Sequence, residues 1–240
     1  MHAASFRLLT LTILVCSLET EADNWPTWRG PFGTGKSTEI RFPVEWSREK
    51  NVRWRIDLPE RGNSSPIVWG NKIFVTQSLE GRGLRQLICF DRKNGKTLWK
   101  KSVEFDRKEP THRTNPYCSS SPVTDGKRVI VSHASAGVFC YDLNGRELWH
   151  RNLGEQKHIW GNGASPVLYK NICFLNFGPG PRTFLVALNG KDGKTIWQHD
   201  EVGGDSGITK DGEKGKWIGS WTTPIVIDGK KGDELLMSYP

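Results

Sequence analysis

The chain has 240 residues, and its 34 Lys and Arg against 26 Asp and Glu give a formal net charge of +8. The basic residues are dispersed, as in the turn Arg92–Lys96, and the sequence has neither a dense basic block nor a recognition helix. We therefore expect no nucleic-acid partner. The length suffices for one domain with a sizeable core.

Residues 1–22 have the pattern of a signal peptide, with cleavage expected after Ala22. The apolar segment Leu8–Leu18 is too short to cross a bilayer as a mature helix, and no later segment is long and apolar enough to do so. We therefore predict an exported protein, periplasmic or extracellular, without a transmembrane segment in its mature chain. Cys16 is disfavoured as a lipidation site because Val15 before it is too large.

Residues 23–50 form a lead-in rich in Trp, Pro and Gly, which we expect to be an extended segment. Within it, Gly30–Ser37 fits the phosphate-binding pattern Gly-x-x-x-x-Gly-Lys-Ser. A working loop of this kind needs a hydrophobic strand before it and a helix after it. Asn24–Arg29 is not such a strand, and Pro43 would stop a helix almost at once. We interpret the match as accidental.

A repeat fills residues 51–240. Cys89–Trp99 recurs with one residue fewer as Cys140–Trp149 and at full length as Ala187–Trp197, and Trp54 ends a further partial copy. The tryptophans are therefore spaced by 45, 50 and 48 residues. A period of this length, built from short strands, predicts radially repeated sheets, that is, an all-β fold of the β-propeller type.

Each repeat opens with small or hydroxyl residues before a proline, followed by a turn signal and two apolar runs, and the tryptophan lies in the last strand. This pattern predicts four antiparallel strands per blade. The complete blades are expected at about 64–103, 119–153 and 163–200, with an incomplete blade from 219. Val52–Leu58 is predicted to be an outer strand without inner strands before it. We thus expect a partial ring of three full blades plus portions of two more, from a longer or truncated protein.

The turn before each tryptophan has a defined chemistry. Asp91, Asp142 and Asn189 are expected to cap their turns through side-chain acceptors, and a glycine four positions on, or three in the shorter copy, supplies the left-handed position. The tryptophan then offers a large apolar surface, and an N–H that needs a partner, to the adjoining blade. We predict this blade-docking role for Trp54, Trp99, Trp149 and Trp197.

The pattern Ala-x-Asp-x-x-Thr-Gly-Lys-x-x-Trp marks the propellers of the PQQ (pyrroloquinoline quinone) repeat family, and residues 50–240 resemble it, most closely at Cys89–Trp99 and Ala187–Trp197. That family includes quinoprotein alcohol dehydrogenases, a cofactor-free lipoprotein of the outer-membrane β-barrel assembly machinery, and unassigned secreted bacterial propellers. The segment Trp25–Pro31 is similar to the last group. The resemblance implies the fold, whereas function depends on the site.

Residues just before each inner strand should face the central channel or its mouth. Amides, imidazoles and indoles arranged in a ring there would suit a sugar, a peptide or a quinone; alternatively, they satisfy backbone groups around a water-filled channel. The candidates are Arg61, Asn63, His112, Asn115, His158, Trp160, Asn162 and Trp221. The polar insertions Glu104–Asn115 and Gly203–Trp217 are either binding loops or spacers.

Neither a catalytic nor a metal site is indicated. The histidines are scattered, and the sequence contains no Gly-x-Ser-x-Gly and no Cys-x-x-Cys. Cys89 and Cys140 occupy equivalent repeat positions where the third copy has Ala187, which favours small buried residues over a disulfide. The family's dehydrogenases hold PQQ over Ca²⁺ with carboxylate and amide oxygens, and many add a disulfide between adjacent cysteines. This chain has no adjacent cysteines and no clear acidic cluster before its inner strands.

The sequence therefore favours a non-catalytic binding or assembly scaffold, and the resemblance to the assembly lipoprotein implies protein partners and an outer-membrane association. The alternative is a PQQ-dependent dehydrogenase that uses Ca²⁺ and has some of its cofactor ligands outside this chain. A third hypothesis is carbohydrate binding through exposed indoles.

Overall fold

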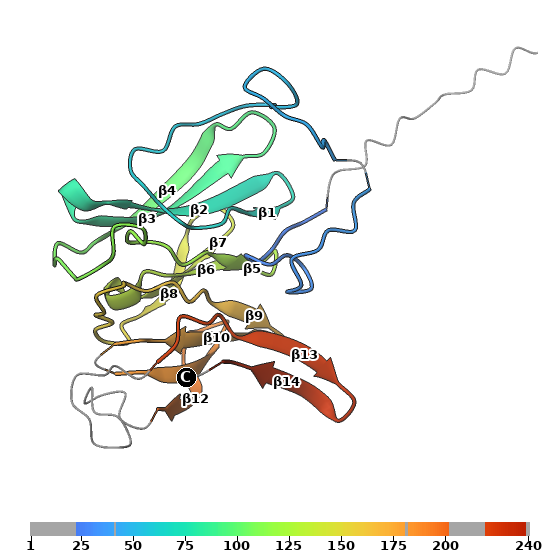
Figure 1. The fold of residues 1–240 in the computed structure, drawn as a ribbon. Helices are drawn as coiled ribbons and strands as arrows, with labels where there is room; N and C mark the ends of the chain where they lie inside the picture. Colours follow the sequence, from blue (N-terminus) through green and yellow to red (C-terminus); the bar gives the residue numbers. More distant parts are fainter. Residues whose placement is uncertain (1–22, 41, 181, 202–218, 239–240) are drawn as a thin grey trace, which may run out of the picture.

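The computed structural model describes residues 23–40, 42–180, 182–201 and 219–238. They form antiparallel sheets that follow one another along the chain and stack side by side (Figure 1). The first sheet contains β1 (Ile67–Trp69), β2 (Lys72–Leu79), β3 (Leu84–Asp91) and β4 (Thr97–Glu104). The second contains β5 (Val123–Thr124), β6 (Arg128–Ser132), β7 (Val138–Asp142) and β8 (Glu147–Arg151).

The third sheet contains β9 (Val167–Tyr169), β10 (Ile172–Phe177), β11 (Phe184–Asn189) and β12 (Thr195–Asp200). A two-stranded sheet of β13 (Ile225–Gly229) and β14 (Gly232–Leu236) follows. Two single-turn 3₁₀ helices, Glu80–Arg82 and Ala134–Ala136, connect second and third strands. The predicted all-β architecture of four-stranded antiparallel blades is confirmed, and the described sheets form an arc that does not close into a ring (Figure 1).

The predicted outer strand at Val52–Leu58 was wrong, because the structure has no strand at these residues. A strand requires a neighbouring strand to complete its hydrogen-bond ladder. Among the described residues, nothing pairs with this segment in a ladder. Trp54 nevertheless occupies the position of a docking tryptophan, as described below.

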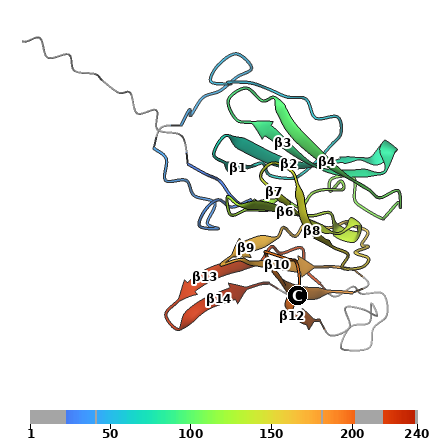
Figure 2. The ribbon, with the colours of Figure 1, turned by 180° about the vertical axis from the view of Figure 1, so that it is seen from behind.

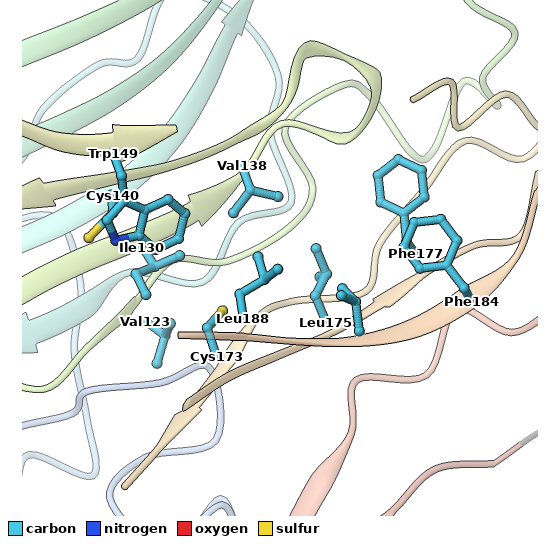
Figure 3. Packing of buried hydrophobic residues seen from close by; sticks show 11 residues of the cluster. Val123, Ile130, Val138, Cys140, Trp149, Cys173, Leu175, Phe177, Phe184 and Leu188 are labelled. Atoms are coloured by element: carbon cyan, nitrogen blue, oxygen red, sulfur yellow. The ribbon is translucent and has the colours of Figure 1, made fainter. Parts of the chain in front are cut away.

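The apolar core lies between successive sheets. Inner strands are covered on both faces, which is why β6 reads as the continuous apolar run Val129–Val131. The fourth strand is more exposed, and β4 alternates exposed and half-buried residues. Figure 3 shows the cluster between the second and third sheets, in which Val123, Ile130 and Val138 meet Leu175, Leu188 and the stacked rings of Phe177 and Phe184.

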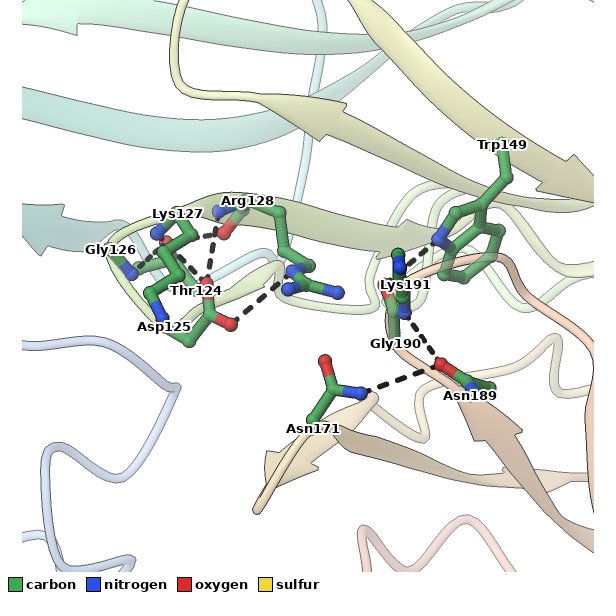
Figure 4. Close-up of polar contacts among 10 residues, drawn as sticks. All are labelled: Thr124, Asp125, Gly126, Lys127, Arg128, Trp149, Asn171, Asn189, Gly190 and Lys191. Atoms are coloured by element: carbon green, nitrogen blue, oxygen red, sulfur yellow. Dashed lines mark hydrogen bonds and ion pairs between the residues drawn. The ribbon is translucent and has the colours of Figure 1, made fainter.

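Trp54, Trp99 and Trp149 each contact the turn of the next sheet in the same way. Trp149 Nε1 donates a hydrogen bond of 3.0 Å to the carbonyl of Gly190 (Figure 4). Gly193, at φ +71°, lies directly against the indole, so that a Cβ at this position would be 2.7 Å from Trp149 Cε3. Trp99 repeats the arrangement, with a bond of 3.1 Å to Leu143 O, and Trp54 does so with a bond of 2.8 Å to Arg92 O.

Side-chain acceptors fix the turns that receive these indoles. Asp91 Oδ1 accepts from the backbone N–H groups of Lys93 and Asn94, at 2.8 and 3.1 Å. Asn189 Oδ1 accepts from Lys191 N at 2.9 Å (Figure 4). The acceptors hold the turn in the conformation that brings glycine under the indole. Trp197 has the equivalent sequence position, but it is 40% exposed whereas Trp149 is 8% exposed.

The start of the lead-in lies beside β1 and β5, the first strands of two neighbouring sheets (Figure 2). Trp25 exchanges two backbone hydrogen bonds with Val68 of β1, at 2.9 and 2.8 Å, and Thr124 N of β5 donates to Pro26 O at 3.0 Å. Residues 30–37 form turns and bends, with Gly30 packed on the Trp25 ring. Within the part of the chain that the structure describes, no helix is long and apolar enough to cross a membrane.

The insertion Glu104–Asn115 is anchored by a buried polar cluster. The Arg85 guanidinium lies 3.9 Å from the centroid of the Tyr117 ring and 5.6 Å from that of Phe105. Tyr117 Oη donates to Glu109 O at 2.5 Å. His133 is fully enclosed beside Cys118, and burial, reinforced by the Arg85 charge, lowers the pKa of His133 from 6.5 to about 3.

We predict that Gly193→Ala lowers the free energy of unfolding by about 2–3 kcal/mol. Two costs add together: the new Cβ clashes with the Trp149 indole, and alanine is strained in the left-handed backbone conformation. Gly70→Ala is the matched control, since Gly70 has φ +53° and open space around it. It should cost only about 1 kcal/mol. Urea unfolding of both variants measures the difference, and equal losses would contradict the docking geometry.

The second prediction concerns pH. Because burial depresses the pKa of His133, the folded state disfavours the proton that the unfolded chain binds below about pH 6.5. The contribution of neutral His133 to the free energy of unfolding is complete above pH 6.5. It falls by up to about 1.4 kcal/mol per pH unit as the pH decreases towards 3. His133→Gln should show a shallower loss of unfolding free energy between pH 7 and 4.5. Parallel pH dependences of the two proteins would contradict the assignment.

Candidate functional site

The candidate site lies where the outer strand of each sheet connects to the inner strand of the next. Because each complete sheet has four antiparallel strands, these connections all emerge at the same end of the sheets. The residues predicted from the sequence lie on these connections. We call this end the channel mouth, formed by residues 59–66, 111–122, 158–166 and 219–224.

A series of hydroxyl groups links the blades at the channel mouth. Ser65 N donates to Ser121 Oγ at 2.8 Å, Ser121 N to Ser165 Oγ at 2.9 Å, and Ser165 N to Thr223 Oγ1 at 2.9 Å. Ser121, Ser165 and Thr223 are buried. A hydroxyl that accepts a bond keeps its own hydrogen as a donor. The series therefore fixes three hydroxyl donors in place.

Several predicted site residues bond to the backbone of a neighbouring connection. Arg61 Nη1 donates to Arg113 O at 2.6 Å, and Asn63 Nδ2 donates to Thr114 O at 2.9 Å. Asn115 Nδ2 donates to the carbonyls of Trp160 and Asn162, at 2.6 and 3.0 Å. Asn162 takes part through its backbone. These contacts make the channel mouth rigid.

The aromatic residues are paired. The rings of His112 and Trp160 have centroids 4.8 Å apart, and those of His158 and Trp221 meet edge to face at 5.0 Å. Trp221 Nε1 donates to Gly161 O at 2.9 Å. Trp160 and Trp221 remain 50% and 41% exposed, while His158 is buried. Burial lowers the pKa of His158, which is consequently neutral at pH 7.

Two adjoining hollows with shared lining residues lie at the channel mouth. The outer one has a volume of about 490 Å³ and is lined by His112, Thr114, Asn115, Trp160 and Trp221. The inner one, of about 530 Å³, includes the hydroxyl series, Asn63, and Trp28 and Arg29 of the lead-in. Asn115 and Trp221 line both hollows. The structure thus brings Asn63, His112, Asn115, Trp160 and Trp221 together, whereas Arg61, His158 and Asn162 support the walls.

These residues do not fit Ca²⁺ with PQQ. Ca²⁺ takes oxygen ligands and favours carboxylates, but neither hollow is lined by Asp or Glu. Within the described ranges, no group of three His, Cys, Asp or Glu side chains could hold a metal ion. Cys89, Cys118, Cys140 and Cys173 are free and buried, and burial raises their thiol pKa values to about 12.

Sequence reasoning missed the hydroxyl series and the lead-in. The sequence does contain a pattern that could have predicted the hydroxyl series. A Ser or Thr directly precedes proline in all four repeats, at Ser65, Ser121, Ser165 and Thr223. The contribution of Trp28 and Arg29 had no local signal, since it depends on the pairing of Trp25 with Val68. The insertion Gly203–Trp217 lies outside the described residues.

Three solved structures illustrate the relationship to known proteins. A europium-containing methanol dehydrogenase matches with a TM-score of 0.55 and 15% identity over 76% of this chain and 33% of its own. Quinohemoprotein alcohol dehydrogenase from Comamonas testosteroni matches with a TM-score of 0.52 and 17% identity, over 74% and 27%. BamB from Moraxella catarrhalis gives 0.39 and 14%, over 62% and 55%.

The two dehydrogenase matches show the fold alone, and this chain spans a third or less of their length. No curated protein matches the sequence. A sequence model of the family described as outer membrane protein assembly factor BamB matches residues 48–211, which is about two thirds of the chain. The chain therefore belongs to this family of PQQ-like repeat propellers.

Proposed function

We propose that the chain is a non-catalytic binding or assembly scaffold. The observation that carries this proposal is the chemistry of the channel mouth, where hydroxyl, amide and indole groups predominate in the lining of both hollows and neither Asp nor Glu contributes. General acid–base catalysis needs a titratable group with a suitable pKa within reach of the substrate. His112 is the one titratable side chain of the outer hollow; its ring is tilted against that of Trp160, and its Nδ1 is bonded to Thr114 Oγ1 at 2.7 Å. Such a lining suits recognition.

A protein partner is supported by an exposed apolar segment of the lead-in. Ile40, Phe42, Val44 and Trp46, which we call the apolar stripe, alternate with other residues and are between 62% and 91% exposed. Large apolar side chains that are exposed together in one segment favour an interaction site. The stripe lies outside the channel mouth, so a partner held there would leave both hollows open.

The proposed location is outside the cytoplasm. The signal-peptide pattern of residues 1–22 lies outside the described residues, and the proposal rests on that pattern and on the family described as an outer membrane assembly factor. The periplasm with an association to the outer membrane is the location that suits an assembly role.

We expect Phe42→Ser with Trp46→Ser to lower crosslinking of the exported protein to its partners by at least about tenfold, because most of the exposed apolar area of the stripe is lost. The control is Leu98→Ser with Leu148→Ser, which removes exposed apolar residues from β4 and β8. Crosslinking in intact cells followed by mass spectrometry measures the effect. Equal crosslinking by both double variants would argue against the stripe.

Reconstitution separates the scaffold from the dehydrogenase. When PQQ and Ca²⁺ are added to the full-length protein, we expect neither quinone absorbance bound to the protein nor dye-linked alcohol oxidation, because neither hollow offers carboxylate ligands. Stoichiometric quinone binding together with alcohol oxidation would overturn the scaffold proposal.

A further inference from the structure

The channel mouth has features that define a class of ligand. Its rim carries two exposed indole planes at 50% and 41% exposure. Trp221 is held by its bond to Gly161 O and by its edge-to-face contact with His158, and Trp160 contacts the tilted His112 ring at a centroid distance of 4.8 Å. Rigid aromatic planes lose little conformational entropy on binding. An apolar plane beside polar groups suits the C–H face of a sugar ring, whose edges carry hydroxyls.

The interior below the indoles is rich in donors. Ser121, Ser165 and Thr223 each accept a backbone N–H through the hydroxyl oxygen, so their O–H hydrogens are the groups available to a ligand. These hydroxyls are buried and therefore require an acceptor. The amide hydrogens of Asn115 are already directed to Trp160 O and Asn162 O. A ligand with several acceptor oxygens complements this wall.

The charged side chain that lines the inner hollow is positive. Arg29 is the one charged side chain among the residues lining the inner hollow. Arg61 and Arg113 lie beside Asn63 and Thr114 at its edge, where Arg61 Nη1 bonds to Arg113 O at 2.6 Å. Neither Asp nor Glu lines either hollow. Hydroxyl donors with a guanidinium, and without a competing carboxylate, favour a carboxylate in the ligand.

We propose that the channel mouth binds an acidic oligosaccharide of the uronate type. A sugar ring stacks on Trp160 and Trp221, while a carboxylate reaches the hydroxyl series and Arg29. The two hollows, of about 490 and 530 Å³, are each of the size of a small-molecule site and share Asn115 and Trp221, so that more than one sugar unit fits along them. This inference rests on the proposed binding function and names the ligand of its site.

The test uses isothermal calorimetry on the full-length protein with trigalacturonate and its methyl ester, which differ in charge. We expect trigalacturonate to bind at least about tenfold more tightly than the ester. Trp160→Ala should weaken binding of both by about tenfold, which corresponds to about 1.4 kcal/mol. Ile159→Ala, at an exposed neighbour that lines neither hollow, should leave both affinities unchanged.

Arg29→Gln tests the charge separately. It should lower affinity for the acid at least about tenfold more than affinity for the ester, which removes the preference for the acid. Absence of binding, equal affinity for acid and ester, or equal binding by triglutamate would overturn the inference, the last in favour of an acidic peptide site. Crosslinking through the apolar stripe is independent of these titrations, so a failure here with intact crosslinking overturns the ligand class and not the scaffold.

Discussion

The docking of an indole on the turn of the next sheet is the interaction on which the structure depends. Each sheet is short, and the last described one has only two strands, so a single sheet buries too little apolar area to be stable alone. Trp99 and Trp149 close the seam between sheets by combining apolar contact with a hydrogen bond to Leu143 O and Gly190 O. The contact needs glycine beneath the indole, which ties the turn sequence to the packing.

The same seams determine the channel mouth. The seams between the first and second sheets and between the second and third each carry a tryptophan contact on the outer strand and a hydroxyl bond just before the inner strand, as in Trp149 to Gly190 and Ser121 to Ser165. Two separated contacts fix the angle between adjacent sheets better than either does alone. The hydroxyls and the indoles of Trp160 and Trp221 are thus held in position by the fold, which would lower the entropy lost on binding the proposed ligand.

The fold was predictable because the sequence of each blade repeats the same turn residues and the same strand spacing. The strand predicted at Val52–Leu58 failed since a ladder depends on a partner that the local sequence does not reveal. The candidate site was predicted only as a ring of residues at the mouth. Its inner wall was not predicted because the hydroxyl residue before each proline was interpreted only as the opening of a repeat. Arg29 reaches the cavity through the distant pairing of Trp25 with Val68.

Whether a residue of the channel mouth has a structural or a binding role depends on whether its polar groups already bond to the protein. Arg61 and Asn63 bond to the backbone carbonyls of Arg113 and Thr114, so they support the interpretation that such residues satisfy the channel wall. A wall satisfied in this way would need no exposed aromatic surface, yet Trp160 and Trp221 keep about half of their area in solvent. Burying those indoles against a ligand would gain apolar contact that the folded chain leaves unused. The exposed aromatic area in excess of structural need is therefore the feature that favours the proposed binding site over a water-filled channel.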